Sequence, residues 1–506
     1  MRPRRRWHRR RHSLQRSATP SNPGASHGLL SGLGVRLLGV DVGTGGNARG
    51  GRRPQRVIVV GAGAAGLTAA NALTTAGVET VVLEARDRLG GRVWPEEVGG
   101  VPVDLGGAWI VGPSGNPVAC VLNREGIGWQ SAESLGGIVR GYDGVLHREM
   151  PESDLWSALA AVGQFEEACP ELVAALGPNA SLEEGFDAFL TKAGLSEPAR
   201  RYAAFALHAT FEGNEAESAD RIALTPTTSE AFDEGGSHFP DGSFRGLITA
   251  LARGVDVRLE TIVSRVEYSE GGVSIETSNG TEHGSHVIVT VPLGVLKAGR
   301  IEFSPALPAD KIEAIERLGM GDLEKVVLRY EQPFWPDPGA NFLFYLGAQP
   351  GEFPLIVDYT SFAGGKPTLI ALYCGAYRRA IADMPDAAIA ARFAEVVAEI
   401  AGHEGAAPSS THVTRWTSDP FAMGSYSYYR AGAGATAAER DTLGAPVGDQ
   451  LLFAGEATSG EHYGYIHGAM LSGAREAERL LDERPGQGVV LESGLLVKEG
   501  CNEAAS

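Results

Sequence analysis

The sequence has little of several features that mark specialised classes of protein. It contains four cysteines in 506 residues, with no CxxC pair and no histidines grouped at metal-ligand spacing. This pattern argues against a disulfide framework and against a structural zinc or other metal site. No run of 18 or more apolar residues occurs, so we expect no membrane span.

Basic residues are scarce outside the first 56 positions. Residues 1–56 hold 13 arginines and one acidic residue, Asp41, and contribute +12 to a net charge of −18, which leaves −30 for residues 57–506. A field of this sign repels nucleic acid and attracts small cations, although such charges also keep a surface solvated. We therefore predict a small-molecule partner and no nucleic acid.

The arginine-rich start, MRPRRRWHRRRHSLQR, allows several interpretations. It is consistent with a nucleic-acid arm, a targeting segment or a wrongly assigned translation start. RRHSL is a poor twin-arginine match, and Arg36 interrupts the apolar stretch that follows. We expect residues 1–56 to be a basic, disordered extension, residues 483–506 to be a C-terminal tail, and the protein to be cytoplasmic.

A glycine-rich turn, GAGAAG at residues 61–66, is the first motif that the chain does contain. It lies between the β-branched run RVIVV and a helix of small residues, and the strand TVVLEA that follows closes with Glu84. In such a unit Gly61 makes the tight turn, Gly63 admits the pyrophosphate, and Gly66 lets helix and strand pack closely. Phosphates face the helix N-terminus and the acid accepts from ribose hydroxyls, so the unit predicts a dinucleotide site.

The next residues distinguish between the possible dinucleotides. EARDRLGGRVW supplies Arg86, Gly91 and Arg92, a second glycine-and-arginine turn for which a nicotinamide enzyme has no need. FAD is held along its whole length, so a second set of donors can serve its pyrophosphate. DLGGAWI (104–110) adds a glycine-rich backbone suited to close approach by a flat ring.

VGAGAAGL, LEARDRLGGR and DLGGAWI resemble the FAD-binding region of the flavin-containing amine oxidase superfamily. This superfamily includes monoamine, polyamine and L-amino-acid oxidases and lysine-specific histone demethylases, and EHYGYIHGAMLSG is most similar to polyamine oxidases. The resemblance covers roughly residues 57–482. The residues that we expect to bind FAD are Gly61, Gly63, Ala65, Gly66, Glu84, Arg86, Gly91, Arg92, Gly107, Ala108, Trp109, Val263, Trp416, Glu456, Tyr465 and Ile466.

The expected fold class is α/β, with a discontinuous FAD-binding Rossmann-type (GxGxxG) domain and an inserted α+β substrate-binding domain. Helical periodicity over residues 151–211 separates strand-rich stretches on either side. The FAD-binding domain is predicted to comprise residues 57–140, 235–300 and 411–482. The substrate-binding domain is predicted to comprise residues 141–234 and 301–410.

Lys325 opens the alternating strand KVVLRYE. Composition alone makes it a solvated surface residue. Its surroundings, RLGMGDLEKVVLRYEQPFW, resemble the superfamily segment whose lysine holds a water beside the flavin N5 atom. The resemblance implies that Lys325 positions water for imine hydrolysis or for the oxygen half-reaction, and a desolvated amine there titrates low.

The aromatic-rich stretch TRWTSDPFAMGSYSYYRAG (414–432) fits core packing as well as binding. Its order RWxxDPFxxGSYSY resembles the flavin-and-substrate segment, which implies that Trp416 packs on the cofactor and that Tyr426 forms one wall of an aromatic cage. Two flat faces exclude water and hold a neutral amine in line with N5. Ser425 stands where monoamine oxidases have a flavin-bonded cysteine, so we expect FAD to be bound non-covalently.

LLFAGEATSGEHYGYIHGAMLSGAREAERL (451–480) contains Glu456, which could cap a helix. Its resemblance to the AGEAT segment implies instead a ligand of the ribityl or pyrophosphate region. Tyr465 matches the second cage position, and Ile466 offers its backbone to the flavin pyrimidine edge, where the helix dipole stabilises the reduced ring. We interpret His467 as structural rather than as a base. Val263, in LETIV, matches a residue whose backbone meets the adenine.

The predicted activity is FAD-dependent amine oxidation, with Lys325, Tyr426 and Tyr465 as catalytic residues and a polyamine as substrate. Hydride passes to flavin N5, the imine is hydrolysed, and O2 is reduced to H2O2. Val111 departs from the histidine or glutamate of several polyamine oxidases. The candidate replacement acids are Glu212, Asp233 and Glu461.

Alternatives stay open at this point. An L-amino-acid or monoamine oxidase is the first alternative, and an L-amino-acid oxidase would need an arginine such as Arg201, Arg245 or Arg378 beside the substrate. A complex-forming histone demethylase is disfavoured, because no long coiled-coil insertion interrupts residues 57–482. A flavin-binding scaffold without turnover would have no need of the lysine and both tyrosines.

Overall fold

The computed structural model describes residues 54–132, 139–225, 236–338 and 342–481. The expectations for the terminal segments, up to residue 53 and from residue 482 onward, and for Asp233, therefore lie outside the described residues. The fold is mixed α/β, and its strands form two large sheets, one four-stranded sheet and three small ones.

A parallel five-stranded sheet carries the glycine-rich turn. Its strand order is β10 (Asp256–Arg258), β2 (Glu79–Leu83), β1 (Arg56–Val60), β14 (His286–Val289) and β23 (Leu451–Phe453). Runs of valine, leucine and isoleucine such as RVIVV form these strands because both faces of a parallel sheet are buried. The strands come from three distant parts of the sequence, each of them in a segment predicted for the cofactor domain.

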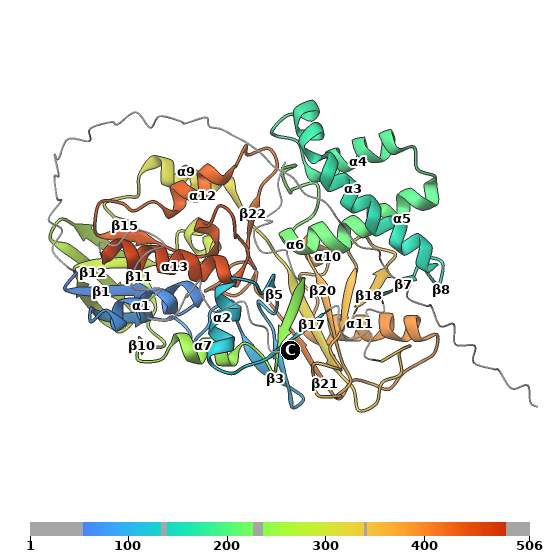
Figure 1. Ribbon diagram of the computed structural model, residues 1–506, viewed down its shortest axis with the longest axis horizontal. Helices are drawn as coiled ribbons and strands as arrows, with labels where there is room; N and C mark the ends of the chain where they lie inside the picture. The colour runs from blue at the N-terminus through green and yellow to red at the C-terminus, as the bar shows by residue number, and fades with distance from the viewer. Residues whose placement is uncertain (1–53, 133–138, 226–235, 339–341, 482–506) are drawn as a thin grey trace, which may run out of the picture. The chain divides into compact units, whose positions relative to one another are not determined.

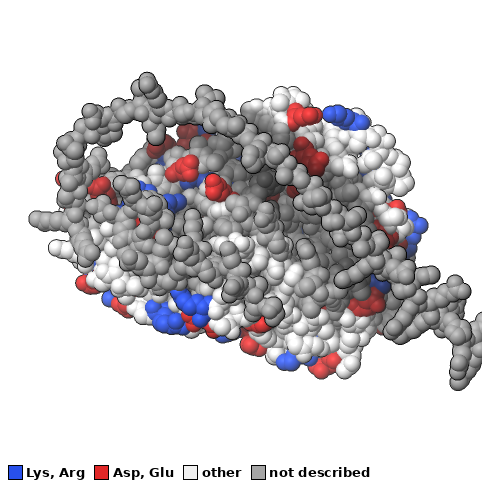
Figure 2. All heavy atoms as spheres, viewed as in Figure 1, with Lys and Arg blue, Asp and Glu red and all other residues white. Residues whose placement is uncertain are grey.

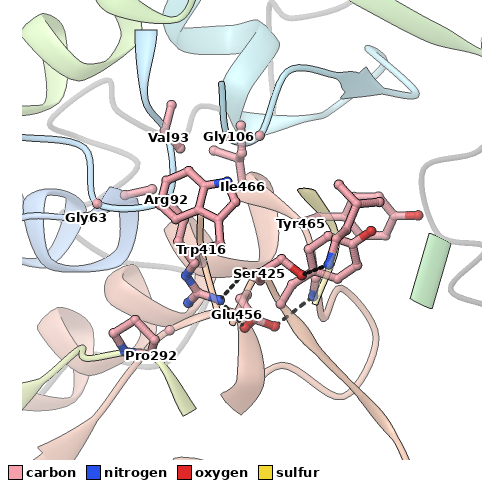
Figure 3. A pocket seen from close by; sticks show the side chains of 18 of the residues that line it. Gly63, Arg92, Val93, Gly106, Pro292, Trp416, Ser425, Glu456, Tyr465 and Ile466 are labelled. Carbon is pink, nitrogen blue, oxygen red and sulfur yellow. Dashed lines mark hydrogen bonds and ion pairs between the residues drawn. The ribbon is translucent and has the colours of Figure 1, made fainter. Parts of the chain in front are cut away.

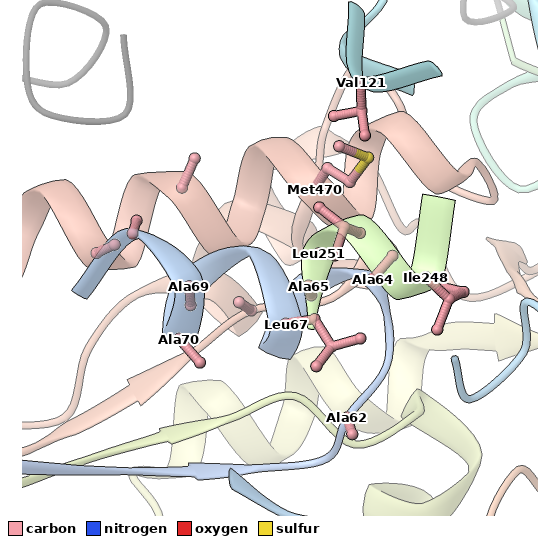
Figure 4. Close-up of a cluster of buried hydrophobic side chains, with 14 of the residues drawn as sticks. Ala62, Ala64, Ala65, Leu67, Ala69, Ala70, Val121, Ile248, Leu251 and Met470 are labelled. Atoms are coloured by element: carbon pink, nitrogen blue, oxygen red, sulfur yellow. The ribbon is translucent and has the colours of Figure 1, made fainter. Parts of the chain in front are cut away.

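Helix α1 (Ala64–Thr75) starts directly after the turn and packs against α13 (Ile466–Leu480) and α7 (Arg245–Leu251) (Figure 1). Small side chains such as Ala65 and Ala69 allow this approach, and larger ones such as Met470 fill the space beside them (Figure 4). A Cβ on Gly473 would lie 2.1 Å from the backbone oxygen of Ala65, so the two helices touch through glycine. This packing fixes the N-termini of α1 and α13 on the same side of the sheet.

The second large sheet has seven strands in the order β21 (Ser410–Val413), β17 (Glu324–Arg329), β20 (Thr368–Tyr373), β19 (Leu355–Asp358), β18 (Phe342–Leu346), β7 (Val139–Asp143) and β8 (Arg148–Glu149). Most neighbours are antiparallel, and β18 and β7 are parallel. Strands β7 and β21 each straddle a predicted domain limit, at residues 140 and 410. The domain boundaries stay a prediction.

The smaller sheets connect these parts. The four-stranded sheet contains β13 (Gly280–Gly284), β12 (Gly272–Thr277), β11 (Val263–Ser269) and β15 (Glu302–Ser304). The remaining pairings are β3 (Pro95–Val98) with β4 (Val101–Asp104), β16 (Leu318–Met320) with β22 (Ser427–Tyr429), and β9 (Ser237–Pro240) between β5 (Ile110–Val111) and β6 (Trp129–Ser131).

The helical stretch predicted for residues 151–211 forms α3 (Glu152–Leu176), α4 (Leu182–Ala193) and α5 (Glu197–Leu207). A π-helical turn, η1 (His208–Glu212), and α6 (Gly213–Glu215) continue α5. The other helical segments are α2 (Pro117–Arg124), α8 (Leu293–Lys297), α9 (Ala309–Arg317), α10 (Gly375–Ala380), α11 (Asp386–Ala401), α12 (Ala437–Gly444) and the 3-10 turn η2 (Glu456–Thr458).

Three negative features concern only the described ranges. Among these residues no helix is long and apolar enough to cross a membrane. They also contain no group of three or more histidine, cysteine or acidic side chains that could hold a metal ion. Cys169 and Cys374, within these ranges, are free and buried.

Candidate functional site

A cavity of about 860 Å³ extends from the glycine-rich turn to strand β17. Its walls come from the carboxyl ends of β1 and β2, the N-terminus of α13 and the segment between β4 and β5. Such a crevice at the carboxyl ends of parallel strands is where α/β proteins bind ligands.

The cavity gathers nearly all of the predicted site residues. Those that line it are Gly61, Gly63, Ala65, Glu84, Arg86, Gly91, Arg92, Gly107, Ala108, Trp109, Val263, Lys325, Trp416, Tyr426, Glu456, Tyr465 and Ile466. Gly66 does not line it. A Cβ on Gly66 would lie 2.0 Å from the backbone oxygen of Gly61, so this glycine permits close packing of the turn against α1.

The turn itself fits a phosphate. Gly61 has φ +106°, a conformation that side-chain-bearing residues rarely adopt. A Cβ on Gly63 would meet no chain atom closer than the Gly90 oxygen at 3.9 Å, so the space in front of it belongs to the cavity. Gly63 is also the N-cap of α1 and provides no side-chain cap, which leaves first-turn N–H groups to a ligand.

Glu84 follows β2 at the same edge of the sheet. Its carboxylate accepts from the backbone N–H of Ala62 (2.7 Å) and of Arg86 (2.9 Å). These bonds hold the side chain in the cavity wall, at the place where a dinucleotide would present a ribose. The Arg86 guanidinium pairs with Asp419 (2.6 Å), so it joins the second glycine turn to the aromatic-rich segment.

A charged network crosses the middle of the cavity (Figure 3). Arg92 donates to the Ser425 backbone oxygen (2.9 Å) and to Glu456 (2.8 Å). The Glu456 carboxylate also accepts from the Ser427 hydroxyl (2.7 Å) and the Gly464 N–H (2.9 Å). Burial raises the pKa of Glu456, but Arg92, the Ser427 hydroxyl and Arg440 outweigh it and hold the pKa below its usual range. Glu456 is therefore a fixed anion rather than a helix cap.

Lys325 lies at the far end of the cavity from the turn. Strand β17 holds its backbone between β20 and β21, and its Nζ donates to the backbone oxygens of Asp104 (2.8 Å) and Gly106 (2.6 Å). Burial lowers its pKa, and the charge of Asp104 acts against that shift. The side chain is 5% exposed, so Lys325 is not the solvated surface lysine that composition alone suggested.

Three predicted aromatic residues surround the same end. Trp416 is buried and packs edge-on against Trp94, with ring centroids 5.7 Å apart. The Tyr426 hydroxyl donates to the backbone oxygen of Gly213. Tyr465 stacks on His467 at 5.0 Å with an interplanar angle of 15°. Burial lowers the pKa of His467 to about 3, so its ring is neutral near pH 7 and supports the tyrosine as packing.

Glu215 lines this end of the cavity and was missed by the sequence analysis. Its carboxylate accepts from the Tyr463 hydroxyl (3.0 Å). Burial raises its pKa to about 7, while Tyr463 and Arg440 act in the opposite direction. Protein surrounds the Glu215 side chain, and the part of its surface that stays accessible faces the cavity. No local pattern in FEGNEAES distinguishes this glutamate, since the π-helical turn η1 determines which residues point inward.

The described acids and arginines named as alternatives do not line the cavity. Glu212 accepts from the Ala219 N–H (2.8 Å) and pairs with His208 (2.8 Å), and the Glu461 side chain is 85% exposed. Arg201, Arg245 and Arg378 do not line the cavity. The arginines that do are Arg86, Arg92 and Arg300. Val111 lines the cavity, as its alignment with a substrate-proximal position implied.

Comparisons with known proteins agree with this geometry. Residues 64–481 match the family of flavin-containing amine oxidoreductases. Lysine-specific histone demethylase 1 homolog 2 of Arabidopsis thaliana is 33% identical over 437 residues, which cover 84% of this chain and 58% of that protein. Polyamine oxidase 4 of Oryza sativa subsp. japonica is 30% identical over 449 residues, which cover 84% and 88%.

A solved structure of wild-type putrescine oxidase bound to putrescine has a TM-score of 0.70 and 21% identity, covering 85% of this chain and 99% of that one. The chain spans little more than half the length of the demethylase homologues that it matches. The two groups of relatives have similar identities, so a closer likeness to polyamine oxidases is not supported by these values.

Proposed function

The chain belongs to the family of flavin-containing amine oxidoreductases, and we propose that it is an FAD-dependent amine oxidase whose substrate is a small polycationic amine such as a polyamine. FAD, when bound, accepts the hydride removed from the carbon next to nitrogen. Water then converts the imine to a carbonyl compound and a free amine, and O2 takes up the two electrons and two protons to form H2O2.

The Glu215 carboxyl group is the observation that carries the choice of substrate. It lines the cavity and lies close enough to Tyr426 to raise the pKa of that hydroxyl, and, unlike Glu456, it has no arginine within ion-pair distance among the described residues; an ammonium ion would stabilise its ionised form. The outer charge is less informative, because acidic and basic side chains are interspersed on the described part of the face in Figure 2. A polyamine has one nitrogen to oxidise and another to carry the charge that Glu215 requires.

The residues around the proposed reaction centre have separate tasks. Tyr426 and Tyr465 exclude water and orient the neutral nitrogen. Lys325 holds the water that attacks the imine. Trp416 would pack on the flavin, and the helix that begins at Ile466 would place its positive end toward the bound ring.

The other end of the cavity would hold the adenosine and pyrophosphate. The proposed Rossmann-type unit uses the N–H groups that follow Gly63 for phosphate and Glu84 for ribose. Arg92 would offset phosphate charge, and the backbone of Val263 would meet the adenine. Ser425 has no thiol that could bond to the flavin, so we propose that FAD is bound non-covalently. Acid precipitation of the holoenzyme should then release FAD into the supernatant. A yellow pellet would contradict this.

A second candidate function is oxidation of a methylated lysine in a peptide, because the demethylase homologues have 33% and 34% identity to this chain. L-amino-acid oxidation has less support. Three arginines line the cavity: Arg86, Arg92 and Arg300. Arg86 and Arg92 lie on the side proposed for the cofactor, where they already pair with Asp419 and Glu456 respectively.

Anaerobic reduction of the flavin distinguishes these candidates. The holoenzyme is mixed with putrescine, spermidine, spermine, a monoamine, an L-amino acid or a dimethyl-lysine peptide, and loss of the blue absorption band is followed. We expect polyamines to bleach it fastest and to yield peroxide in air. Bleaching by the peptide alone would replace the polyamine proposal, and absence of bleaching by every compound would refute amine oxidation.

A further inference from the structure

The two hydrogen bonds of Lys325 leave one position on its Nζ atom for the cavity. An ammonium group has three N–H donors, and two of them go to the backbone oxygens of Asp104 and Gly106. A neutral amine could satisfy the same two oxygens and would then direct its lone pair at the cavity. The charge on Lys325 thus determines whether a water there meets a donor or an acceptor.

Asp104, whose backbone oxygen accepts from Lys325, also carries a buried carboxyl group that interacts electrostatically with this lysine. It ends strand β4, is 3% exposed and does not line the cavity. Both of its oxygens lie 3.1 Å from the N–H of Phe244, which caps α7. Burial raises the pKa of Asp104, while the Phe244 N–H and Lys325 lower it.

Few other charges face this pair. Arg245, the first residue of α7, is exposed and has a smaller effect on Asp104 than Lys325 has. Tyr359 lies close to Asp104, and burial raises the pKa of its hydroxyl above the ordinary tyrosine value, so the hydroxyl is uncharged near pH 7. Glu324, next to Lys325, directs its carboxylate to the Thr414 hydroxyl (2.6 Å) and the Trp416 N–H (3.0 Å) instead.

We infer that Asp104 is a positioning residue whose carboxylate keeps Lys325 protonated and so determines which hydrogen-bonding group Nζ presents to the cavity. The ionised carboxylate favours the cation, with its third N–H available for water. Removal of the carboxylate charge favours the neutral amine. The consequence for turnover rests on the proposed function, but the effect of Asp104 on the charge of Lys325 does not.

The chain is well suited to a direct test, because it contains six lysines: Lys192, Lys297, Lys311, Lys325, Lys366 and Lys498. The holoenzyme is labelled with lysine carrying ¹³C at Cε, and the six signals are titrated by NMR. Lys325→Met identifies the signal of interest. In Asp104→Asn, which retains an acceptor for the Phe244 N–H, we expect the midpoint of that signal to fall by about one to three pH units.

Two kinds of control separate this effect from general damage to the fold. Lys311, which is also buried, and Lys297, which is exposed, both donate to backbone oxygens and should titrate unchanged in Asp104→Asn. Asp143→Asn removes another buried acid, bonded to the Tyr202 hydroxyl (3.1 Å) in the seven-stranded sheet, and should leave Lys325 unchanged. An unchanged or raised midpoint for Lys325 in folded Asp104→Asn would overturn the inference.

Wild-type protein provides a test even if Asp104→Asn does not fold. Two interacting groups titrate in linked steps, so the Lys325 signal should respond in two phases. One phase near the ordinary lysine range would also overturn the inference. If the protein oxidises an amine, its pH profile of turnover should contain an inflection that Lys325→Met abolishes. In Asp104→Asn this inflection should move to lower pH by the shift that NMR measures. A protein that oxidises no amine would refute the proposed function and leave the NMR test intact.

Discussion

Lys325 and Lys311 have similar burial but different hydrogen bonding. Lys311, in α9, donates to the backbone oxygens of Thr442 (2.7 Å), Leu443 (2.8 Å) and Ala445 (2.7 Å) at the end of α12. Burial lowers its pKa to about 8, as burial also lowers the pKa of Lys325. All three donors of Lys311 are used by the helix end, whereas Lys325 uses two and lines a cavity.

This difference shows that burial and a lowered pKa do not by themselves identify a functional lysine. A helix C-terminus presents unpaired carbonyl groups, and a cation there is stabilising. Lys297 makes the same kind of contact with α9, through the oxygens of Ile315 (2.7 Å), Glu316 (2.9 Å) and Leu318 (2.8 Å). The functional candidate is the lysine that has bonding capacity left for a ligand.

Of the variants that test this comparison, Lys325→Met should have the largest effect, on turnover. The side chain that we propose to hold the attacking water is lost, so we expect turnover of a polyamine to fall by about 100-fold, which corresponds to about 2.7 kcal/mol in the activation barrier. Steady-state and stopped-flow kinetics of the FAD-loaded variant measure this. Unchanged rates of both oxidation and reoxidation would show that the lysine has no such role.

Lys311→Met should show the opposite pattern. Three carbonyl groups lose their donors, and we expect the free energy of unfolding to fall by about 2 kcal/mol, measured by chemical denaturation. Turnover per folded molecule should stay within twofold of wild type. A loss of turnover in folded Lys311→Met would break the distinction between the two lysines.

Glu215 extends the comparison to acids, because Glu212 is bonded within the fold while Glu215 faces the cavity. In Glu215→Gln we expect KM for spermidine to rise about tenfold, or about 1.4 kcal/mol, with little change for a monoamine. Since the pKa of Glu215 is about 7, the acid is ionised above that pH, and the wild-type KM for a polyamine should increase as pH falls below 7. The variant should lose this pH dependence. Equal changes for both amines would argue against charge recognition.

The smallest effect is expected for Lys297→Met. One of its three bonds, to Glu316, is exposed, so water can replace the lost donor there. We expect the free energy of unfolding to fall by about 1 kcal/mol, less than for Lys311→Met, and turnover to be unchanged. A larger fall in the free energy of unfolding than in Lys311→Met would mean that exposure of the carbonyl groups does not determine how much stability is lost with the lysine.

Much of the fold was accessible to sequence reasoning because it depends on local patterns. The strand before Gly61, the small-residue helix after it and the strand that precedes Glu84 are present in this order as β1, α1 and β2. Helical periodicity likewise predicted α3 to α5. The π-helical turn at their end was not predicted, since an inserted residue in a helix leaves no periodic signal.

The candidate site divides in the same way. Gly63, Glu84 and Glu456 stand in motifs whose spacing is visible, and all three line one cavity. Glu215 stands in no motif. Asp104 was quoted within DLGGAWI, but nothing in that string indicates that its backbone oxygen receives the Lys325 side chain, 221 positions away.

The sequence alone determined the family and the expected cofactor, because phosphate- and flavin-binding turns require particular glycines and acids at fixed local spacing. The resemblance already singled out Lys325, but only the tertiary structure showed how its hydrogen bonding differs from that of Lys311, and only the structure distinguished Glu215 from Glu212. In each pair the residues are chemically identical, and what separates them is whether other groups of the fold have already used their hydrogen bonds. That property depends on how the chain packs, and no local stretch of sequence records it.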